Sequence, residues 1–326
     1  MKIKKENLYV IISFVLLLII CYMAISVIFF KKISLSPSSD FNAYINNYMR
    51  FSERIWPKID NLIDWFLNSA SFHFLYEWLS IISGSPEYSL FGLSLVSGIG
   101  LVCLAVRRFS FTYLLPLLLL SHPRFLDLVV GQVRMALALV VFALALNIKN
   151  KSLSFLLIIA AVSIHLGIII PIMAFFIYLL SKIIKRLVHM EVFESAGWRR
   201  FDLLNLLAIF ALPSSYIIIV NIDFIQMIRG IDAGAGGDLY ILMWVFTALG
   251  ILFFAPVTLS FLHGFLFYSM IGLVSLGFFF DVYTSRIIAL AIFFLAISLG
   301  RLSTSQQSVL YPIILPNLFL SYYYWI

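Results

Sequence analysis

Two apolar stretches of this 326-residue chain each carry a side chain that is charged or readily charged. Arg134 lies within the run Val129 to Leu146, and His165 lies within the run Leu153 to Leu180. A charge inside an apolar helix is costly unless it has a partner, so such residues mark functional sites by default. Arginine binds phosphate through a planar fork of donors, and histidine exchanges protons near neutral pH. The two residues therefore predict a site that holds an anion and moves a proton.

Each of these residues also has a structural interpretation. Arg134 could snorkel to the membrane surface or form a structural ion pair, and His165 could hydrogen-bond a backbone carbonyl in the core. Arg286 follows a turn and could pair with Asp281. These interpretations stay open beside the functional ones.

Composition places the chain in a membrane. Hydrophobic residues make up 63% and charged residues 11% of the sequence, which leaves too few polar side chains to cover a soluble core. The net charge of +7 arises from short Lys and Arg clusters between apolar runs, as the positive-inside rule produces. A basic face with interleaved aromatic residues is missing, so no nucleic-acid partner is expected. Cys21 and Cys103 lie in apolar spans and are interpreted as core fillers.

The sequence predicts an all-α, polytopic membrane helix bundle of about 10–11 transmembrane segments. It would form a single integral membrane domain over residues 1–326. The apolar run Leu8 to Phe30 is expected to remain as a membrane anchor, with the N-terminus in the cytoplasm. Residues 31–87 are expected to form an outer loop, in which the segment Asn61 to Ser83 would lie in the interface as an amphipathic helix.

Two breaks are predicted inside apolar sequence. Phe111 to Leu120 should rise to the outer surface, turn at residues 121–125 and return as the next span. The run 153–180 is longer than a straight span and has basic residues at both ends, so two short helices should meet at a break near His165 and Gly167. One long tilted helix is the alternative.

On this topology the outer loops and outer helix ends gather charged side chains. The set comprises Asp40, Arg50, Glu53, Arg124, Asp127, Arg134, His165, Arg229, Asp232, Asp238, Asp281 and Arg286. Several arginines at one face indicate an anionic ligand, and a lipid-linked pyrophosphate fits because its tail occupies the bilayer. The sequence shows no Walker motif and no carboxylate pair with metal spacing, so no metal and no cofactor is expected.

Four short motifs follow one another between about Asp40 and Arg301. They are Asp40-Phe41 with Tyr44 and Tyr48, the run Val133-Arg134-Met135-Ala136-Leu137-Ala138, Ser154-Phe155 followed by Ala161-Val162-Ser163-Ile164-His165, and Ser285-Arg286-Ile287. Together they resemble the EpsG-like family of bacterial polysaccharide polymerases, which includes the Wzy-type O-antigen polymerases. In that family the arginine is usually followed by glutamine, whereas Met135 stands here and removes one polar neighbour of Arg134.

The resemblance implies an enzyme of the bacterial inner membrane whose active site faces the periplasm. Its substrate would be an undecaprenyl-pyrophosphate-linked oligosaccharide, whose glycan would move to a sugar hydroxyl of another lipid-linked repeat unit. Arg134 and Arg286 would bind the pyrophosphate as charge develops on the leaving group. His165 would be the base or a further phosphate ligand, with Asp40 as the rival base. Secondary site candidates are Arg124, Arg229 and Asp232.

Two other functions fit a chain with many spans and intramembrane charges. A lipid-linked oligosaccharide flippase would share both features, but the chain is short for one and shows no convincing two-half repeat. A membrane O-acyltransferase of the polysaccharide pathway would use a histidine, expected near the N-terminus with an arginine-rich partner motif that is missing. For a polymerase, a chain-length regulator would be a further partner.

Overall fold

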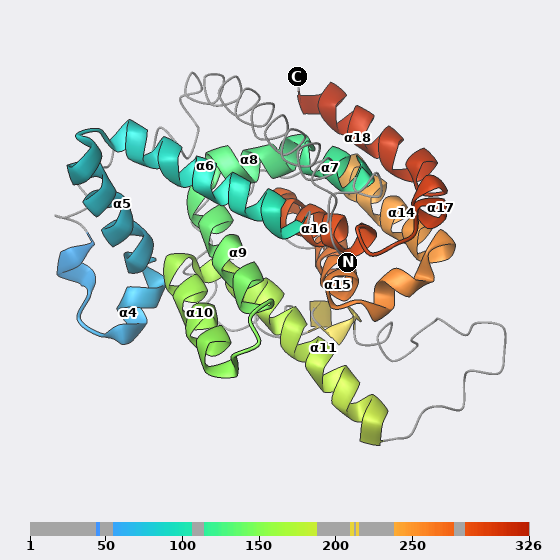
Figure 1. Cartoon of the computed structure of the whole chain (residues 1–326), viewed down its shortest axis with the longest axis horizontal. Helices are drawn as coiled ribbons and strands as arrows, with labels where there is room; N and C mark the ends of the chain where they lie inside the picture. The colour runs from blue at the N-terminus through green and yellow to red at the C-terminus, as the bar shows by residue number, and fades with distance from the viewer. Residues whose placement is uncertain are drawn as a thin grey trace, which may run out of the picture. The chain divides into compact units, whose positions relative to one another are not determined.

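The computed structural model describes residues 44–45, 55–105, 114–187, 209–211, 213–214, 238–276 and 284–325. These residues form helices joined by short turns, and none of them lies in a strand (Figure 1). The all-α prediction is confirmed for this part of the chain. In chain order the elements are η2 (Trp56–Lys58), α4 (Leu62–Leu67), α5 (Ala70–Ser83), α6 (Pro86–Ala105), α7 (Leu114–Leu120), α8 (Pro123–Gly131), α9 (Val133–Ala145), α10 (Lys151–Ile164), η4 (Leu166–Ile168), α11 (Ile169–Leu187), α14 (Asp238–Phe254), η7 (Pro256–Ser260), α15 (Leu262–Ser275), α16 (Thr284–Leu299), α17 (Thr304–Ser308) and α18 (Tyr311–Trp325).

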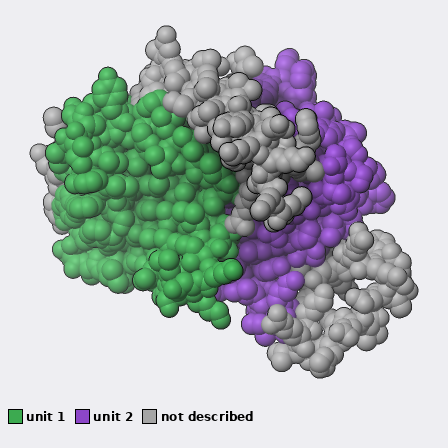
Figure 2. All heavy atoms as spheres, viewed as in Figure 1, with its two compact units in different colours: residues 1–109, 126–168 green, residues 110–125, 169–326 purple. Residues whose placement is uncertain are grey.

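The chain divides into two compact units, which Figure 2 colours separately. Unit 1 comprises residues 1–109 and 126–168, and unit 2 comprises residues 110–125 and 169–326. The divisions fall within α8 and between η4 and α11. Arg134 and His165 therefore belong to unit 1, whereas Arg124 and Arg286 belong to unit 2.

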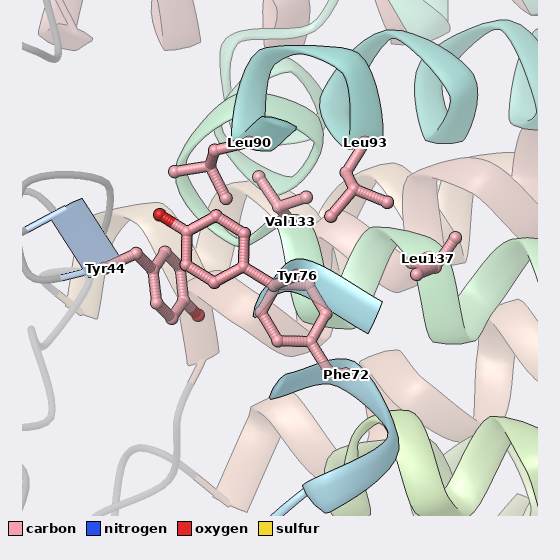
Figure 3. Packing of buried hydrophobic residues seen from close by; sticks show 7 residues of the cluster. All are labelled: Tyr44, Phe72, Tyr76, Leu90, Leu93, Val133 and Leu137. Atoms are coloured by element: carbon pink, nitrogen blue, oxygen red, sulfur yellow. The ribbon is translucent and has the colours of Figure 1, made fainter. Parts of the chain in front are cut away.

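Unit 1 is built around α9, which packs against α6 and α10, while α5 packs against the same two helices. Their shared core is the cluster drawn in Figure 3: Tyr44, Phe72, Tyr76, Leu90, Leu93, Val133 and Leu137. Burying each large apolar side chain contributes about 1.5–3 kcal/mol relative to leaving it exposed. Because α5, α6 and α9 each supply members, the cluster fixes α5 against the first turns of α9.

The segment predicted as an amphipathic interfacial helix is two helices, α4 and α5. Asn61 caps α4 by accepting hydrogen bonds from the backbone N–H groups of Ile63 and Asp64. The chain then turns at Ser69, whose left-handed backbone (φ 52°) separates the two helices. The exposed large apolar side chains of α5 are Phe74, Trp78, Ile81 and Ile82. The polar His73 lies on the opposite, buried face, and the interfacial position of the segment stays a prediction.

The predicted turn at residues 121–125 is a bend between two helices. α7 ends at Leu120, α8 begins at Pro123, and the two helices are bent by 56° at the break. Proline suits the first turn of α8 because it has no N–H to donate. The chain therefore kinks here, whereas the sequence suggested a reversal into one unbroken returning span. A further break at Gln132, which sequence reasoning missed, separates α8 from α9.

The predicted break near His165 is confirmed. α10 begins after Asn150, which accepts hydrogen bonds from the backbone N–H groups of Ser152 and Leu153, and it ends at Ile164. His165 then has an extended backbone (φ −156°, ψ 121°) before the single turn of η4. The alternative of one unbroken helix through this region is wrong.

Unit 2 is centred on α15 and α16, which pack along each other. Every residue of α16 from Ile287 to Leu299 is buried, as expected for a helix that is apolar on all sides. α7 packs on α16, α11 and α14 pack on α15, and α18 packs on α14. At the start of α15, a Cβ on Gly264 would overlap the carbonyl oxygen of Thr258, so glycine permits this close approach.

Helices that could cross a membrane are present in the described part of the chain. By length and composition they are Pro86–Ala105 and Leu166–Ile184, and the bent pair α7 and α8 would make a third. The shorter apolar helices, of 10–17 residues, are Val133–Ala145, Lys151–Ile164, Leu239–Phe254, Leu262–Ser275 and Arg286–Leu299. A straight crossing needs about 20 residues. The full number of spans therefore stays a prediction.

Candidate functional site

Arg134 is the second residue of α9 and follows the break at Gln132. Its neighbour Val133 is fully buried in the core cluster, whereas the Arg134 side chain is half-buried. The positive end of a helix dipole lies at its N-terminus, so the helix does not offset the charge of Arg134. The break thus places a permanent cation at the edge of the unit 1 core.

Two residues from distant parts of the sequence contact the guanidinium. Nε of Arg134 donates a hydrogen bond to the hydroxyl of Tyr44 at 2.8 Å, and Cζ lies 5.2 Å from the centroid of the Tyr44 ring. Nη1 lies 3.4 Å from Nε2 of His73. Because arginine only donates, Nε2 of His73 is the acceptor and its ring proton is on Nδ1.

His73 must be neutral to accept this hydrogen bond. It projects from α5 and is 5% exposed. The pKa of His73 is lowered from 6.5 to about 2, chiefly by burial and then by the charges of Arg134 and His165. His73 is therefore neutral at physiological pH and orients the guanidinium without competing with it for an anion.

His165 lies at the break after α10 and is half-buried. Its charge contributes to lowering the pKa of His73, which places the two imidazoles near each other. A Cβ on Gly167 would lie 2.5 Å from Cε of Met135 and 3.4 Å from Nε2 of His165. Glycine thus allows Met135, the neighbour of Arg134, to pack against the break. Unit 1 therefore brings the predicted pair Arg134 and His165 into one neighbourhood.

An aromatic wall of Tyr44, Phe72 and Tyr76 supports this neighbourhood (Figure 3). The ring centroids of Tyr44 and Phe72 lie 5.8 Å apart, and those of Phe72 and Tyr76 lie 6.0 Å apart in a stacked arrangement. Tyr44 is 8% exposed. Because the Tyr44 ring packs against buried aromatic rings, its hydroxyl is held in place and the hydrogen bond with Arg134 is preorganised.

Within the described ranges, neutral groups alone contact Arg134, and no described carboxylate pairs with it. Tyrosine and neutral histidine fix the orientation of the guanidinium but do not neutralise its charge. A cation without a counter-charge at the edge of an apolar core is costly. The structural ion pair stays an alternative beside the anionic ligand, because Asp40 lies outside the described ranges.

The described segments contain no group of three His, Cys, Asp or Glu side chains that could hold a metal ion. His73 and His165 are two imidazoles, but the nearby positive charge of Arg134 disfavours a further cation.

The other predicted site residues belong to unit 2 or lie outside the described ranges. Arg286 is the third residue of α16 and is half-buried in unit 2. Arg124 is the second residue of α8, and its Cζ lies 5.4 Å from the centroid of the Tyr240 ring, also in unit 2. The predicted site residues outside the described ranges are Asp40, Arg229 and Asp232.

His73 is the site residue that sequence reasoning missed, and Tyr44 entered only through the family resemblance. One signal was present: His73, Tyr76 and Ser80 follow one another at helical spacing and form a buried face of α5. A polar stripe along an apolar helix indicates a face turned inward.

Comparisons with family models, with curated proteins and with solved structures found no match to this chain. The likeness to polysaccharide polymerases therefore stays a prediction from the sequence motifs. Function is inferred from those motifs and from the geometry around Arg134.

Proposed function

We propose that the protein is a polysaccharide polymerase of the O-antigen type. It transfers a glycan from an undecaprenyl-pyrophosphate carrier to a sugar hydroxyl of another lipid-linked repeat unit, on the periplasmic face of the bacterial inner membrane. One observation carries the proposal. Arg134 presents a guanidinium at the edge of an apolar helical core, bonded to Tyr44 and His73 and to no described carboxylate.

A fixed cation would stabilise the leaving group of the proposed reaction. The bond between the anomeric carbon of the donor sugar and a diphosphate oxygen breaks, and its electron pair goes to that oxygen. The hydroxyl oxygen of the acceptor sugar forms the new bond to the anomeric carbon, and its proton goes to a base. Because negative charge on the diphosphate grows as the bond breaks, a preorganised guanidinium stabilises the transition state more than the ground state.

The contacts of Arg134 with described residues use Nε and Nη1 of its donor fork. Tyr44 accepts from Nε, and His73 lies against Nη1, while neither contact involves Nη2. The fork of an arginine can bind a diphosphate through two parallel hydrogen bonds. Arg286, in unit 2, is the second pyrophosphate ligand that the family resemblance implies.

His165 is the proposed base for the acceptor hydroxyl, and Asp40 is the rival. His165 is half-buried at the helix break between α10 and η4. Histidine exchanges a proton near neutral pH, as a base for a sugar hydroxyl requires. His73 is a positioning residue, because its nitrogen is engaged with Arg134.

The substrate must be held at a bilayer surface because its carrier is a lipid. The membrane-length helices and the shorter apolar helices are consistent with such a setting. The complete polymerase would have about 10–11 spans, from the positive-inside pattern of the sequence. A chain-length regulator would be its protein partner.

A complementation experiment tests the proposal. A strain that lacks the protein would receive the wild type, Arg134→Ala or Arg134→Lys, and the membrane abundance of each variant and the length of the surface polysaccharide would be measured. Wild type should restore long chains, whereas both variants should leave a single repeat unit on the lipid-A core. Lysine keeps the charge but loses the Nε donor that Tyr44 requires.

The same strain separates the competing functions. Total loss of surface polysaccharide in the deletion strain would favour a flippase, and unchanged chain length with a lost ester would favour an O-acyltransferase. Normal long chains from Arg134→Ala at wild-type abundance would remove Arg134 from the mechanism. Arg301→Ala is the matched control, because exposed Arg301 lies over the Phe261 ring at 5.5 Å and should not affect chain length.

A further inference from the structure

Gly167 lies at the helix break beside His165, and its backbone does not require a glycine. Among the described residues, Gly84 is the glycine with a positive φ, so the backbone of Gly167 is one that alanine can adopt. The turn η4 runs through Gly167, and the backbone N–H of Ile168 donates to the carbonyl oxygen of His165 at 3.1 Å. The missing side chain at residue 167 therefore matters for space and not for conformation.

Two side chains border the space beside Gly167. A Cβ built at this position would lie 2.5 Å from Cε of Met135, 3.4 Å from Nε2 of His165 and 3.7 Å from Cδ2 of the same imidazole. The end of the Met135 side chain thus overlaps the place that an alanine methyl would take, and the same place borders the imidazole. A methionine fills an irregular gap of this kind well because its side chain is apolar and unbranched.

The backbone on both sides of His165 is anchored. Ile164, before it, packs against the core cluster of unit 1, and Ile168, after it, is fully buried. The imidazole itself is half-buried, so its orientation depends on the side chains that it packs against. Met135 is 5% exposed and belongs to the first turn of α9, which packs on η4. A buried neighbour in a close-packed interior restricts the rotamers of the imidazole.

Two routes connect the imidazole of His165 to the guanidinium of Arg134. Met135 directly follows Arg134 on α9. On the other route, Nη1 of Arg134 lies 3.4 Å from Nε2 of His73, and the charge of His165 acts on that second imidazole. The four residues form one connected group within unit 1. A change in the packing of one member is therefore expected to shift the others.

We propose that Met135 is a positioning residue, which uses the space left by Gly167 to hold the imidazole of His165 in a fixed place relative to Arg134. This role rests on the proposed function, in which His165 takes the proton of the acceptor hydroxyl while Arg134 stabilises the leaving diphosphate. A base must lie within hydrogen-bond reach of the proton that it takes, so a misplacement of about 1 Å is costly. Met135 acts through the imidazole and is not a catalytic residue.

Filling a gap would be a simpler role for Met135. In that case its loss would change the stability of unit 1 and would leave His165 unchanged in the folded protein. Positioning predicts in addition that His165 itself changes, in its reactivity and in its contribution to turnover. The two roles are therefore separated by measurements on equal amounts of folded protein.

Two single variants and their combination test the positioning role. In Met135→Ala a gap opens beside the imidazole, and in Gly167→Ala the new methyl displaces the end of the Met135 side chain. The double variant, Met135→Ala with Gly167→Ala, should recover. Its new methyl would lie 3.4 Å from Nε2 of His165, in ordinary packing contact, and would fill the gap from the other side.

The first measurement is the rate at which diethyl pyrocarbonate modifies His165 at pH 7. The full chain would be used in lipid nanodiscs, and the modified peptide would be followed by mass spectrometry. Each single variant should differ from the wild type by at least about threefold, and the double variant should lie within about twofold of it. Gly100→Ala is the matched control, since its Cβ would crowd Val140 at 3.2 Å on a later turn of α9 and should leave the rate at His165 unchanged.

Glycan elongation by the same samples tests the link to the proposed reaction. Each single variant should lower kcat about tenfold and should leave KM for the lipid-linked donor within about twofold of the wild type, because both keep the fork of Arg134. The double variant should regain most of the lost kcat. Gly100→Ala should elongate as the wild type does.

Wild-type rates of His165 modification in both single variants would overturn the positioning role, as would a double variant no closer to the wild type than either single variant. If Gly167→Ala does not fold, a wild-type rate in Met135→Ala would overturn it equally. If the wild type elongates no glycan but the variants show the expected pattern of modification, Met135 still positions His165 and the polymerase proposal fails. If elongation depends on Arg134 while all modification rates are equal, the polymerase proposal stands and the positioning role fails.

Discussion

The side chains that contact Arg134 belong to residues far away in the sequence. Tyr44 is 90 positions before it and His73 is 61 positions before it. A charge in an apolar run is visible in the sequence, which is why Arg134 and His165 could be selected. The residues that contact Arg134 could not be predicted in this way. Their contact with the guanidinium depends on how α5 packs against α9, and the hydrophobic periodicity of the sequence does not indicate that packing.

Tyr44→Phe tests whether the orientation of Arg134 matters. The change removes the acceptor of the 2.8 Å hydrogen bond from Nε and keeps the aromatic ring. A hydrogen bond to a charged group contributes about 1.5–3 kcal/mol, so diphosphate affinity at the Arg134 site should fall about tenfold or more. The check is a titration of inorganic pyrophosphate into the wild type and Tyr44→Phe in lipid nanodiscs. Tyr88→Phe, at an exposed position of α6, should have no effect, and equal affinity for Tyr44→Phe and wild type would exclude the orienting role.

The buried imidazole of His73 predicts a pH dependence of stability. Its pKa falls from 6.5 to about 2 on folding, so below pH 6.5 the unfolded chain binds a proton that the folded chain does not. Stability should therefore decrease as the pH falls below 6.5 and should be unaffected by this group above it. Between pH 6.5 and 5 the loss is about 2 kcal/mol, from a slope of about 1.4 kcal/mol per pH unit.

Thermal unfolding midpoints in detergent at pH 7.5 and pH 5 measure this effect. His73→Asn keeps a hydrogen-bonding group but does not titrate, so it should show a smaller difference between the two pH values than the wild type. The same difference in both proteins would mean that His73 is not the group responsible.

The helix breaks at Gln132 and His165 determine where the site residues lie more than the helix lengths do. The break at His165 was predictable because the apolar run was too long for one span and carried Gly167. The break at Gln132 was not, since Leu128 to Leu146 reads as continuous apolar sequence around one charge. This second break sets Arg134 at the start of α9, where its side chain reaches the edge of the core instead of its middle.

Gly264→Ala tests the close packing of η7 and α15 in unit 2. The new Cβ would overlap the carbonyl oxygen of Thr258 and approach Oγ of Ser298 at 2.9 Å, and backbone cannot move aside cheaply. We expect a loss of about 1–3 kcal/mol, the usual cost of overpacking. Gly92→Ala in α6, where a Cβ meets nothing within 4 Å, is the control and should keep the wild-type unfolding midpoint. Equal midpoints for both variants would contradict this packing.

In the described part of the chain the predicted helices are confirmed, and Pro86–Ala105 and Leu166–Ile184 are long and apolar enough to cross a membrane. Composition does not indicate where the chain divides into two compact units. Positive-inside patterning gives sides to loops only when helix ends are known. The bend of 56° between α7 and α8 lies where the sequence predicted a reversal of the chain.

Cysteine labelling tests the sidedness on which a periplasmic site depends. In a chain with Cys21 and Cys103 replaced by alanine, Ser38→Cys should react with a membrane-impermeant maleimide from the periplasmic side. Lys149→Cys, in the loop assigned to the cytoplasm, should react only after the membrane is permeabilised. Labelling of Ser38→Cys only after permeabilisation would place residues 31–87 inside and contradict the outer loop.

The most direct measurement is glycan elongation by the purified chain in nanodiscs that contain a polyprenyl-diphosphate-linked repeat unit. Wild type, Arg134→Gln and Arg301→Gln would be compared at equal amounts of folded protein. Loss of a charge-stabilising donor costs about 10²–10³-fold in rate, so Arg134→Gln should elongate at least about 100-fold more slowly, with Arg301→Gln unchanged. Elongation by Arg134→Gln within twofold of the wild type, or no elongation by the wild type, would contradict the account.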